Sequence, residues 1–319
     1  MKRIFSVLIA GVMAFALSVS AFAAFPDMPA GENGAIIQRA VDNGLISGFE
    51  DGTVRPDSPI SRAQMATIMS RAMNASDAAD LSKFVDVKPE DWFYDAMSKA
   101  VAMEAFKGDD KLKLNPNNSI SRQEAMIVLS RIFDIPSADA SVLNAFSDAN
   151  TVASWATKEV SAIVAGGYLD GVSALRATEP MTRLEFAQIM DKIVAQYIDA
   201  DGEYTAVNGN VLVRAQNVKF IGVKGNYNIY TGDGVKGNIE FADCDANNVI
   251  IRGGRAVMNS GSYNRIRAIG SKTIVELKTS TTNLLKKDLN GNVNPVYAKP
   301  GKGIVIQPTT TIEIDMSKK

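Results

Sequence analysis

Histidine is absent from this chain of 319 residues, and cysteine occurs once, at Cys244. Without histidine the chain has no Ser-His or Cys-His catalytic pair and no histidine-ligated metal site. One cysteine forms no disulfide within a chain. Because free cysteine is mostly buried, we expect Cys244 to be a small core residue rather than a reactive thiol or an intermolecular link. Carboxylate chemistry is the kind of catalysis that these absences leave open.

An excess of charge of either sign is also missing. The chain has 34 Lys and Arg against 35 Asp and Glu, which gives a net charge of −1. Neither a nucleic acid nor an anionic membrane surface is therefore indicated as a partner. Long apolar runs are missing beyond the amino terminus, so no membrane span is expected. The composition, 46% hydrophobic and 22% charged, is ordinary for a folded soluble protein.

The amino terminus holds the one long uncharged apolar run. Lys2 and Arg3 precede it, it extends over residues 4–19, and Ala21-Phe22-Ala23 fits an A-x-A cleavage site. This pattern predicts a secretory signal peptide over residues 1–23. We therefore expect the mature protein to be secreted.

A motif of Ser or Thr, then Arg, then Gln or Glu two residues further on occurs three times. It starts a helix each time, because the first residue is a good N-cap and the last completes a capping box. An apolar stripe at helical spacing follows each copy. A first helix is expected upstream in each repeat, over about residues 33–43, 91–104 and 153–165, so each repeat is helix, loop, helix. The three copies are Ser61-Arg62-Ala63-Gln64, Ser121-Arg122-Gln123-Glu124 and Thr182-Arg183-Leu184-Glu185.

Further motifs accompany the repeats, and together they resemble the S-layer homology (SLH) domain family. They are Phe-x-Asp at Phe25, Phe84 and Phe146, aromatic clusters at Trp92-Phe93-Tyr94 and at Trp155, and Gly48-x-x-Asp51-Gly52 with Pro56. The resemblance implies an all-α, pseudo-threefold domain with repeats at 24–78, 79–140 and 141–198. It also implies non-covalent attachment to the bacterial cell wall. The implied partner is an anionic, often pyruvylated, secondary cell-wall polysaccharide or, in some lineages, modified peptidoglycan.

The arginine of the repeated motif is the leading candidate for ligand contact. At the first helical position a cation meets the positive end of the helix dipole, which is unfavourable by about 0.3–1 kcal/mol. An anion bound at unpaired N-terminal N–H groups would reverse that penalty. The alternative is a structural ion pair, with Asp51, Asp57, Asp109 or Asp110 as partners. If the arginines bind ligand, their truncation is expected to leave the melting temperature almost unchanged. The candidate arginines are Arg62, Arg122 and Arg183.

Glycines and tryptophans complete the candidate site. Gly48, Gly108 and Gly171 would let the backbone approach a sugar closely. Trp92 and Trp155 offer an apolar face for a sugar ring, although each is equally interpreted as a core anchor of its helix. Asp27, Asp86 and Asp148 are interpreted as turn or capping groups. The third repeat, which lacks the loop proline and the Asp-Gly pair, is expected to bind least well.

The last third of the chain, residues 201–319, changes character. Short β-type runs alternate with Asn and Gly, which predicts a small all-β solenoid. An antiparallel sandwich is the alternative. Residues 303–306 and 311–314 are expected to form a closing hairpin or cap. The β-type runs lie at residues 211–213, 218–221, 228–230, 239–241, 249–251, 265–269 and 273–277.

These observations predict a non-catalytic anchoring protein, associated with the cell wall or S-layer, that displays its β region outward. That region could self-associate or bind another surface protein. The alternative is an anchored polysaccharide-processing enzyme whose active site lies on the β region. Its weak support is the carboxylate pair of Asp243 and Asp245. Asp288, Asn290 and Asn292 have the spacing of a calcium loop, but Val293 and Lys299 replace needed residues, so no metal site and no cofactor are expected.

Overall fold

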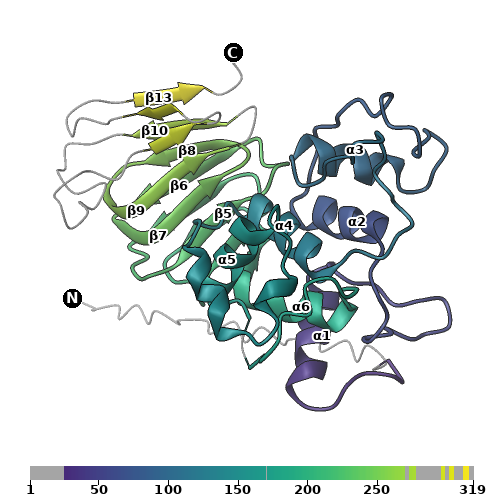
Figure 1. Cartoon of the computed structure of the whole chain (residues 1–319). Helices are drawn as coiled ribbons and strands as arrows, with labels where there is room; N and C mark the ends of the chain where they lie inside the picture. The colour runs from purple at the N-terminus through teal and green to yellow at the C-terminus, as the bar shows by residue number, and fades with distance from the viewer. Residues whose placement is uncertain are drawn as a thin grey trace, which may run out of the picture.

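The computed structural model of the chain describes residues 25–169, 171–269, 273–277, 296–298, 302–304 and 312–315. The predicted signal peptide and the rejected calcium motif at Asp288, Asn290 and Asn292 lie outside the described residues. Within the described part, a helical region is followed by a stack of β-strands (Figure 1). No helix in that part is long and apolar enough to cross a membrane.

Each repeat contributes two α-helices, as the motifs predict. In the second helix of each repeat both hydrogen bonds of the capping box are present. Trp92 and Trp155 precede their helices instead of lying within them, so these first helices begin later than predicted. The 3₁₀ segments Ala140–Ala145 and Ala149–Thr151 lead into the third repeat. The helices are α1 (Glu32–Asp42), α2 (Arg62–Ala72), α3 (Tyr94–Ala102), α4 (Arg122–Ile132), α5 (Thr157–Ala165) and α6 (Arg183–Ile193).

The three repeats close into a ring. Helix α2 packs against α3, α4 against α5, and α6 returns to pack against α1. At the centre the backbone N–H of Ile60 donates to the carbonyl of Met181, that of Met181 to Ile120, and that of Ile120 to Ile60, each over 2.9 Å. The apolar residue before each capping box therefore joins the three repeats in a triangle. The pseudo-threefold helical arrangement is confirmed.

The β region is a solenoid of two mainly parallel sheets, and the antiparallel sandwich is wrong. The chain alternates between the sheets, so Val211, Ile229, Val249 and Ile266 stack in register inside the coil. Sheet 1 holds β1 (Gln196–Ile198), β3 (Val211–Val213), β5 (Asn228–Thr231), β7 (Cys244–Ile251), β9 (Gly261–Ala268), β11 (Val296–Ala298) and β12 (Lys302–Ile304). Sheet 2 holds β2 (Gly202–Tyr204), β4 (Val218–Ile221), β6 (Asn238–Ala242), β8 (Arg255–Met258), β10 (Ile274–Leu277) and β13 (Ile312–Asp315).

Both ends of the solenoid differ in detail from the sequence-based expectation. Strand β1 pairs with β3 and so opens the solenoid inside the range assigned to the third repeat. At the other end, β12 pairs antiparallel with β11, and β13 pairs antiparallel with β10. The two carboxy-terminal stretches thus end different sheets instead of pairing with each other as one hairpin.

One face of sheet 1 is docked on the helical region. Leu212, Tyr230 and Ile250 occupy neighbouring outward positions of β3, β5 and β7 and belong to the same apolar core as the helices. The ring of Phe133, at the end of α4, meets that of Tyr230 edge-on with centroids 4.9 Å apart. Arg252 is buried and donates to the carbonyls of Ile132 and Met103. The β region is therefore packed on the repeats and shares a core with them, and its outward display at the cell surface stays a prediction.

Cys244 is buried in the solenoid, and its reactivity gives a first prediction. Its Sγ lies 3.4 Å from the carbonyl oxygens of Phe220 and Ala242, and burial raises the pKa of the thiol. Because the thiolate is the reactive form, native protein at neutral pH should react slowly with iodoacetamide and quickly once unfolded in urea. The measurement is the alkylation rate with and without denaturant. A fast native reaction, or a disulfide-linked dimer on a non-reducing gel, would contradict the buried thiol.

Candidate functional site

The three candidate arginines leave their own helices and end on the next repeat around the ring. The Nε of Arg62 donates to the carbonyl of Leu114 over 2.7 Å. Arg122 makes the same bond to Leu175, and Arg183 makes it to Val54, also over 2.7 Å. The last of these bonds connects the third repeat back to the first. Each arginine therefore ties two repeats together.

A second contact of each guanidinium depends on the capping residue of the next repeat. Nη1 of Arg62 lies 2.8 Å from Glu124, and Nη1 of Arg122 lies 2.8 Å from Glu185. The first repeat has Gln64 at this position, and Arg183 instead donates to the carbonyl of Ser47 over 2.6 Å. The ion pairs thus form with the capping glutamates and not with the aspartates nearby in sequence.

Burial completes the structural role of the arginines. The side chain of Arg122 is 2% exposed and that of Arg62 is 13% exposed, and Arg183 is also buried. Burial lowers the pKa of all three guanidinium groups, which stay protonated because an arginine starts far above neutral pH. Their carbonyl and carboxylate partners offset the unfavourable helix position. The expectation that truncation leaves the melting temperature unchanged therefore loses its basis.

The helix N-termini do not present unpaired donors. The N–H of Arg62 donates to the carbonyl of Asn118, and that of Ala63 donates to Pro116. The side chain of Ser61 accepts the N–H of Gln64. The equivalent first-turn donors of α4 and α6 are bonded in the same way to the next repeat. The interpretation of these termini as open anion sites is wrong, because neighbouring loops already fill them.

The aspartates of the Phe-x-Asp motifs fasten the loops. Asp27 accepts the N–H groups of Val54 and Arg55, and Asp86 and Asp148 make the equivalent pairs of bonds in their repeats. These hydrogen bonds lower the pKa of Asp27 against the opposing effect of desolvation. The three aspartates are therefore structural, as the sequence suggested.

Close packing against an aromatic ring explains why two of the candidate positions are occupied by glycine. A Cβ at Gly48 would lie 2.4 Å from the ring of Phe25, and one at Gly108 would lie 2.3 Å from the ring of Phe84. The phenylalanine of the motif thus packs directly on the glycine of the loop. Gly171 is different, since it has a φ of +69° and open space where a Cβ would be.

A groove of about 590 Å³ combines candidates from all three repeats. Arg62 comes from the first repeat, Gly108 from the second, and Trp155 from the start of the third. The indole of Trp155 is 59% exposed and that of Trp92 is 68% exposed, so the interpretation of either as a core anchor is wrong. We call this the Arg62–Trp155 groove. Its other lining residues include Phe106, Asp109, Lys113, Asn118, Glu124 and Arg131.

Charge in the Arg62–Trp155 groove is balanced in a way that leaves cations available. The carboxylate of Glu124 is paired with Arg62, and Asp109 is hydrogen-bonded by Asn115 and by the N–H of Lys113, which lowers its pKa. The side chains of Lys107, Lys113 and Asp110 are exposed along the same loop, so two lysines stand against one further carboxylate. Exposed cations beside an exposed indole suit an anionic saccharide.

A second groove, of about 370 Å³, lies one repeat further on and holds Arg122 and Gly171. We call it the Arg122–Gly171 groove. Ile36, from the first repeat, lines it, and no tryptophan is among its described lining residues. Trp92 lies before α3, which packs on α2, whereas Arg183 reaches the loop of the first repeat beside Gly48. The structure thus distributes the candidates over several sites around the ring.

Sequence reasoning missed the aromatic partners of the arginines. The guanidinium of Arg62 lies 5.2 Å from the ring centre of Phe106, and that of Arg183 lies 5.0 Å from Phe49. The two phenylalanines are not equivalent positions, because Phe106 precedes the loop glycine Gly108 whereas Phe49 follows Gly48, so alignment of the repeats does not reveal them. The ligand role of the eight candidate residues stays a prediction.

Comparison with known proteins agrees with the geometry. A family model described as "S-layer homology domain" matches residues 24–66, 83–126 and 145–187. The chain is 33% identical to the surface-layer 125 kDa protein of Lysinibacillus sphaericus over 51% of its length, and 30% identical to the middle cell wall protein of Brevibacillus brevis over 41%. It is 24% identical to the exoglucanase XynX of Acetivibrio thermocellus over 43%. The chain spans 14%, 13% and 13% of these relatives, respectively.

Proposed function

Because this chain belongs to the S-layer homology domain proteins of the cell surface, we propose that it holds an anionic, pyruvylated secondary cell-wall polysaccharide in the grooves between its repeats. The observation that carries the proposal is the Arg62–Trp155 groove, in which an exposed indole lies beside exposed lysines. A flat apolar ring suits the C–H face of a sugar, and a cation suits its carboxylate. The same chemistry admits modified peptidoglycan as the polymer.

The arginines have a supporting part in this proposal. Arg62 is held by Leu114 and Glu124 and still lines the groove, so its remaining N–H groups can reach a ligand carboxylate. Because its position is fixed before binding, little conformational entropy is lost when the ligand arrives. Arg122 also lines the second groove, but its side chain is 2% exposed, so its part there is to hold the repeats together.

We further propose a non-catalytic role for the β region. Asp243, one member of the carboxylate pair that suggested an enzyme, lies between β6 and β7 with a φ of +54° and pairs with Lys224 over 2.8 Å. It therefore does not share a strand face with Asp245. The relatives named above include both surface-layer proteins and a glucanase, so the repeats themselves do not decide this point.

A binding prediction tests the groove. Replacing Trp155 by alanine should weaken binding to purified cell walls by about tenfold, because an exposed aromatic anchor contributes more than 1 kcal/mol at such a surface. The melting temperature should change little, since the indole is largely outside the core. The measurement is cosedimentation with walls before and after extraction of the secondary polysaccharide.

Val85→Ala is the matched control, because Val85 is another exposed hydrophobic residue and does not line the groove. It should bind as the unchanged chain does. Equal binding by the Trp155→Ala chain would overturn the groove as the wall site. Binding that survives polymer extraction would assign the ligand to peptidoglycan.

A further inference from the structure

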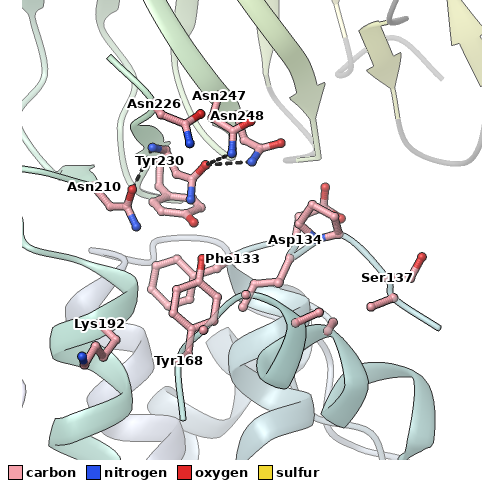
Figure 2. Close-up of a pocket in the computed structure, with 18 residues that line it drawn as sticks. Phe133, Asp134, Ser137, Tyr168, Lys192, Asn210, Asn226, Tyr230, Asn247 and Asn248 are labelled. Carbon is pink, nitrogen blue, oxygen red and sulfur yellow. Dashed lines mark hydrogen bonds between the residues drawn. The ribbon is translucent and has the colours of Figure 1, made fainter. Parts of the chain in front are cut away.

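A cavity of about 500 Å³ lies between the helical region and sheet 1, beside the place where Leu212, Tyr230 and Ile250 pack on the helices. Figure 2 shows asparagine side chains from the solenoid facing aromatic side chains from the helical region across it. Tyr168 and Lys192 line both this cavity and the Arg122–Gly171 groove. The two spaces are therefore neighbours that share a boundary, whereas the Arg62–Trp155 groove shares no lining residue with the cavity.

The solenoid side of the cavity is a column of amides. Asn228 and Asn248 are register partners in β5 and β7, and the Nδ2 of Asn248 donates to the Oδ1 of Asn228 over 2.7 Å. The backbone N–H of Asn228 donates to the side-chain oxygen of Asn210, and the Nδ2 of Asn247 donates to the Oδ1 of Asn228. These bonds fix the amides in place, and an amide offers both a donor and an acceptor. Such a surface complements adjacent hydroxyl groups.

The opposite side of the cavity is aromatic. Phe133 and Tyr168 come from the helical region (Figure 2), whereas Tyr230 belongs to β5 on the solenoid side and meets the ring of Phe133 edge-on. Burial raises the pKa of both tyrosine hydroxyls, so they are neutral. Phe133, Tyr168 and Tyr230 are 1%, 9% and 3% exposed, so the rings add a small apolar surface beside the amides. Apolar and amide surface together match a pyranose, which has apolar C–H faces and hydroxyls at its edge.

The charges around the cavity argue against a cationic ligand. Asp134 is the lining carboxylate, and it is paired with both Arg265 and Arg267 of β9. Lys192, on α6, is an exposed cation at the boundary with the Arg122–Gly171 groove. A neutral or acidic ligand is therefore favoured.

We propose that this interdomain cavity is a further saccharide-binding site, which takes a segment of wall glycan continuing from the Arg122–Gly171 groove. The inference rests on the proposed function only for the identity of the polymer. The hydroxyl-rich chain comes from the secondary polysaccharide or from the glycan strands of peptidoglycan, and both present the chemistry that amides and aromatic rings recognise. Docking of the solenoid thus builds a site that neither region has alone.

The test fills the cavity without disturbing the fold. Ser137 is an exposed lining residue, so Ser137→Trp places an indole in the space, and Asn226→Ala removes an amide from its edge. Asn238→Ala is the control, because Asn238 is an exposed asparagine at the start of β6 in the other sheet. All three are made in the whole chain and in the Trp155→Ala chain. The probes are soluble oligosaccharides from purified secondary polysaccharide and muramidase-released peptidoglycan fragments, measured by titration calorimetry.

Ser137→Trp is expected to lower affinity for one of the two probes by about tenfold, because the indole takes space that the saccharide needs and so prevents one or two of its hydrogen bonds. Asn226→Ala should act in the same direction and Asn238→Ala should have no effect. The loss should appear in both backgrounds. Unchanged affinity in Ser137→Trp for both probes overturns this site and leaves the Arg62–Trp155 groove standing. If Ser137→Trp lowers the affinity and Trp155→Ala does not, the result supports the interdomain cavity and overturns the Arg62–Trp155 groove as a binding site. A melting curve for each variant excludes unfolding as the cause.

Discussion

Replacing Arg122 by alanine is expected to lower the free energy of unfolding by about 3–5 kcal/mol, the usual cost when one partner of a buried ion pair is removed. The side chain is 2% exposed and bonds the carbonyl of Leu175 and the carboxylate of Glu185. Alanine leaves the carbonyl of Leu175 without this donor in a buried place, and Glu185 keeps Arg176 as its ion-pair partner, so the loss is expected at the lower end of this range. Urea unfolding followed by circular dichroism gives the measurement.

Arg62→Ala is the matched variant. It removes the equivalent pair of contacts, here to Leu114 and Glu124, from a side chain that is 13% exposed. Water can reach the vacated site, so a smaller loss is expected. An Arg122→Ala chain as stable as the unchanged protein would show that the arginine acts only on ligand, as the sequence alone suggested. A large loss of stability together with normal wall binding would make the arginine purely structural.

Placing a carboxylate in the docked face of the solenoid should have a comparable effect. Ile250 is 1% exposed and belongs to the core that joins sheet 1 to the helices. Ile250→Asp removes apolar burial and buries an unpaired charge, so we expect a loss of more than about 3 kcal/mol. We also expect calorimetry to resolve two transitions where the unchanged chain shows one, because the shared core couples the two regions.

Lys219→Ala is the control for this variant. Lys219 is exposed on the outer face of sheet 2, and its pair with Glu203 is a surface ion pair, worth about 0–1 kcal/mol. This chain should unfold in one transition close to that of the unchanged protein. Two transitions in the unchanged chain would contradict the coupling, and so would an Ile250→Asp chain of normal stability.

Local signals account for what the sequence predicted well. Capping boxes act within one turn of a helix, so the starts of α2, α4 and α6 follow directly from Ser61, Ser121 and Thr182. The parallel solenoid follows from short β-type runs between Asn and Gly corners, since side-chain alternation is also local. Strand β1, only three residues long and containing Gln196, has too little pattern to be predicted.

The contacts that were missed join residues distant in sequence. Arg122 and Leu175 are 53 residues apart and meet because consecutive repeats pack together, whereas Arg183 and Val54, 129 residues apart, meet only because the ring closes. The docking of the solenoid did leave a signal. All three residues of β3, Val211–Val213, are buried, as are the last four of β7, which ends at Ile251. Consecutive apolar residues in a strand indicate burial on both faces, and the second face had to be covered by something.

The triangle of Ile60, Ile120 and Met181 sets a rule for how this region can change in length. Each corner both gives and receives one backbone hydrogen bond, so the figure is complete with three members. Deleting one repeat would leave a backbone donor and a backbone acceptor without partners in the core. Inserting a fourth repeat would break the closed triangle of hydrogen bonds. Duplication or loss of such units by recombination should therefore be tolerated in sets of three, whereas a linear solenoid grows one coil at a time.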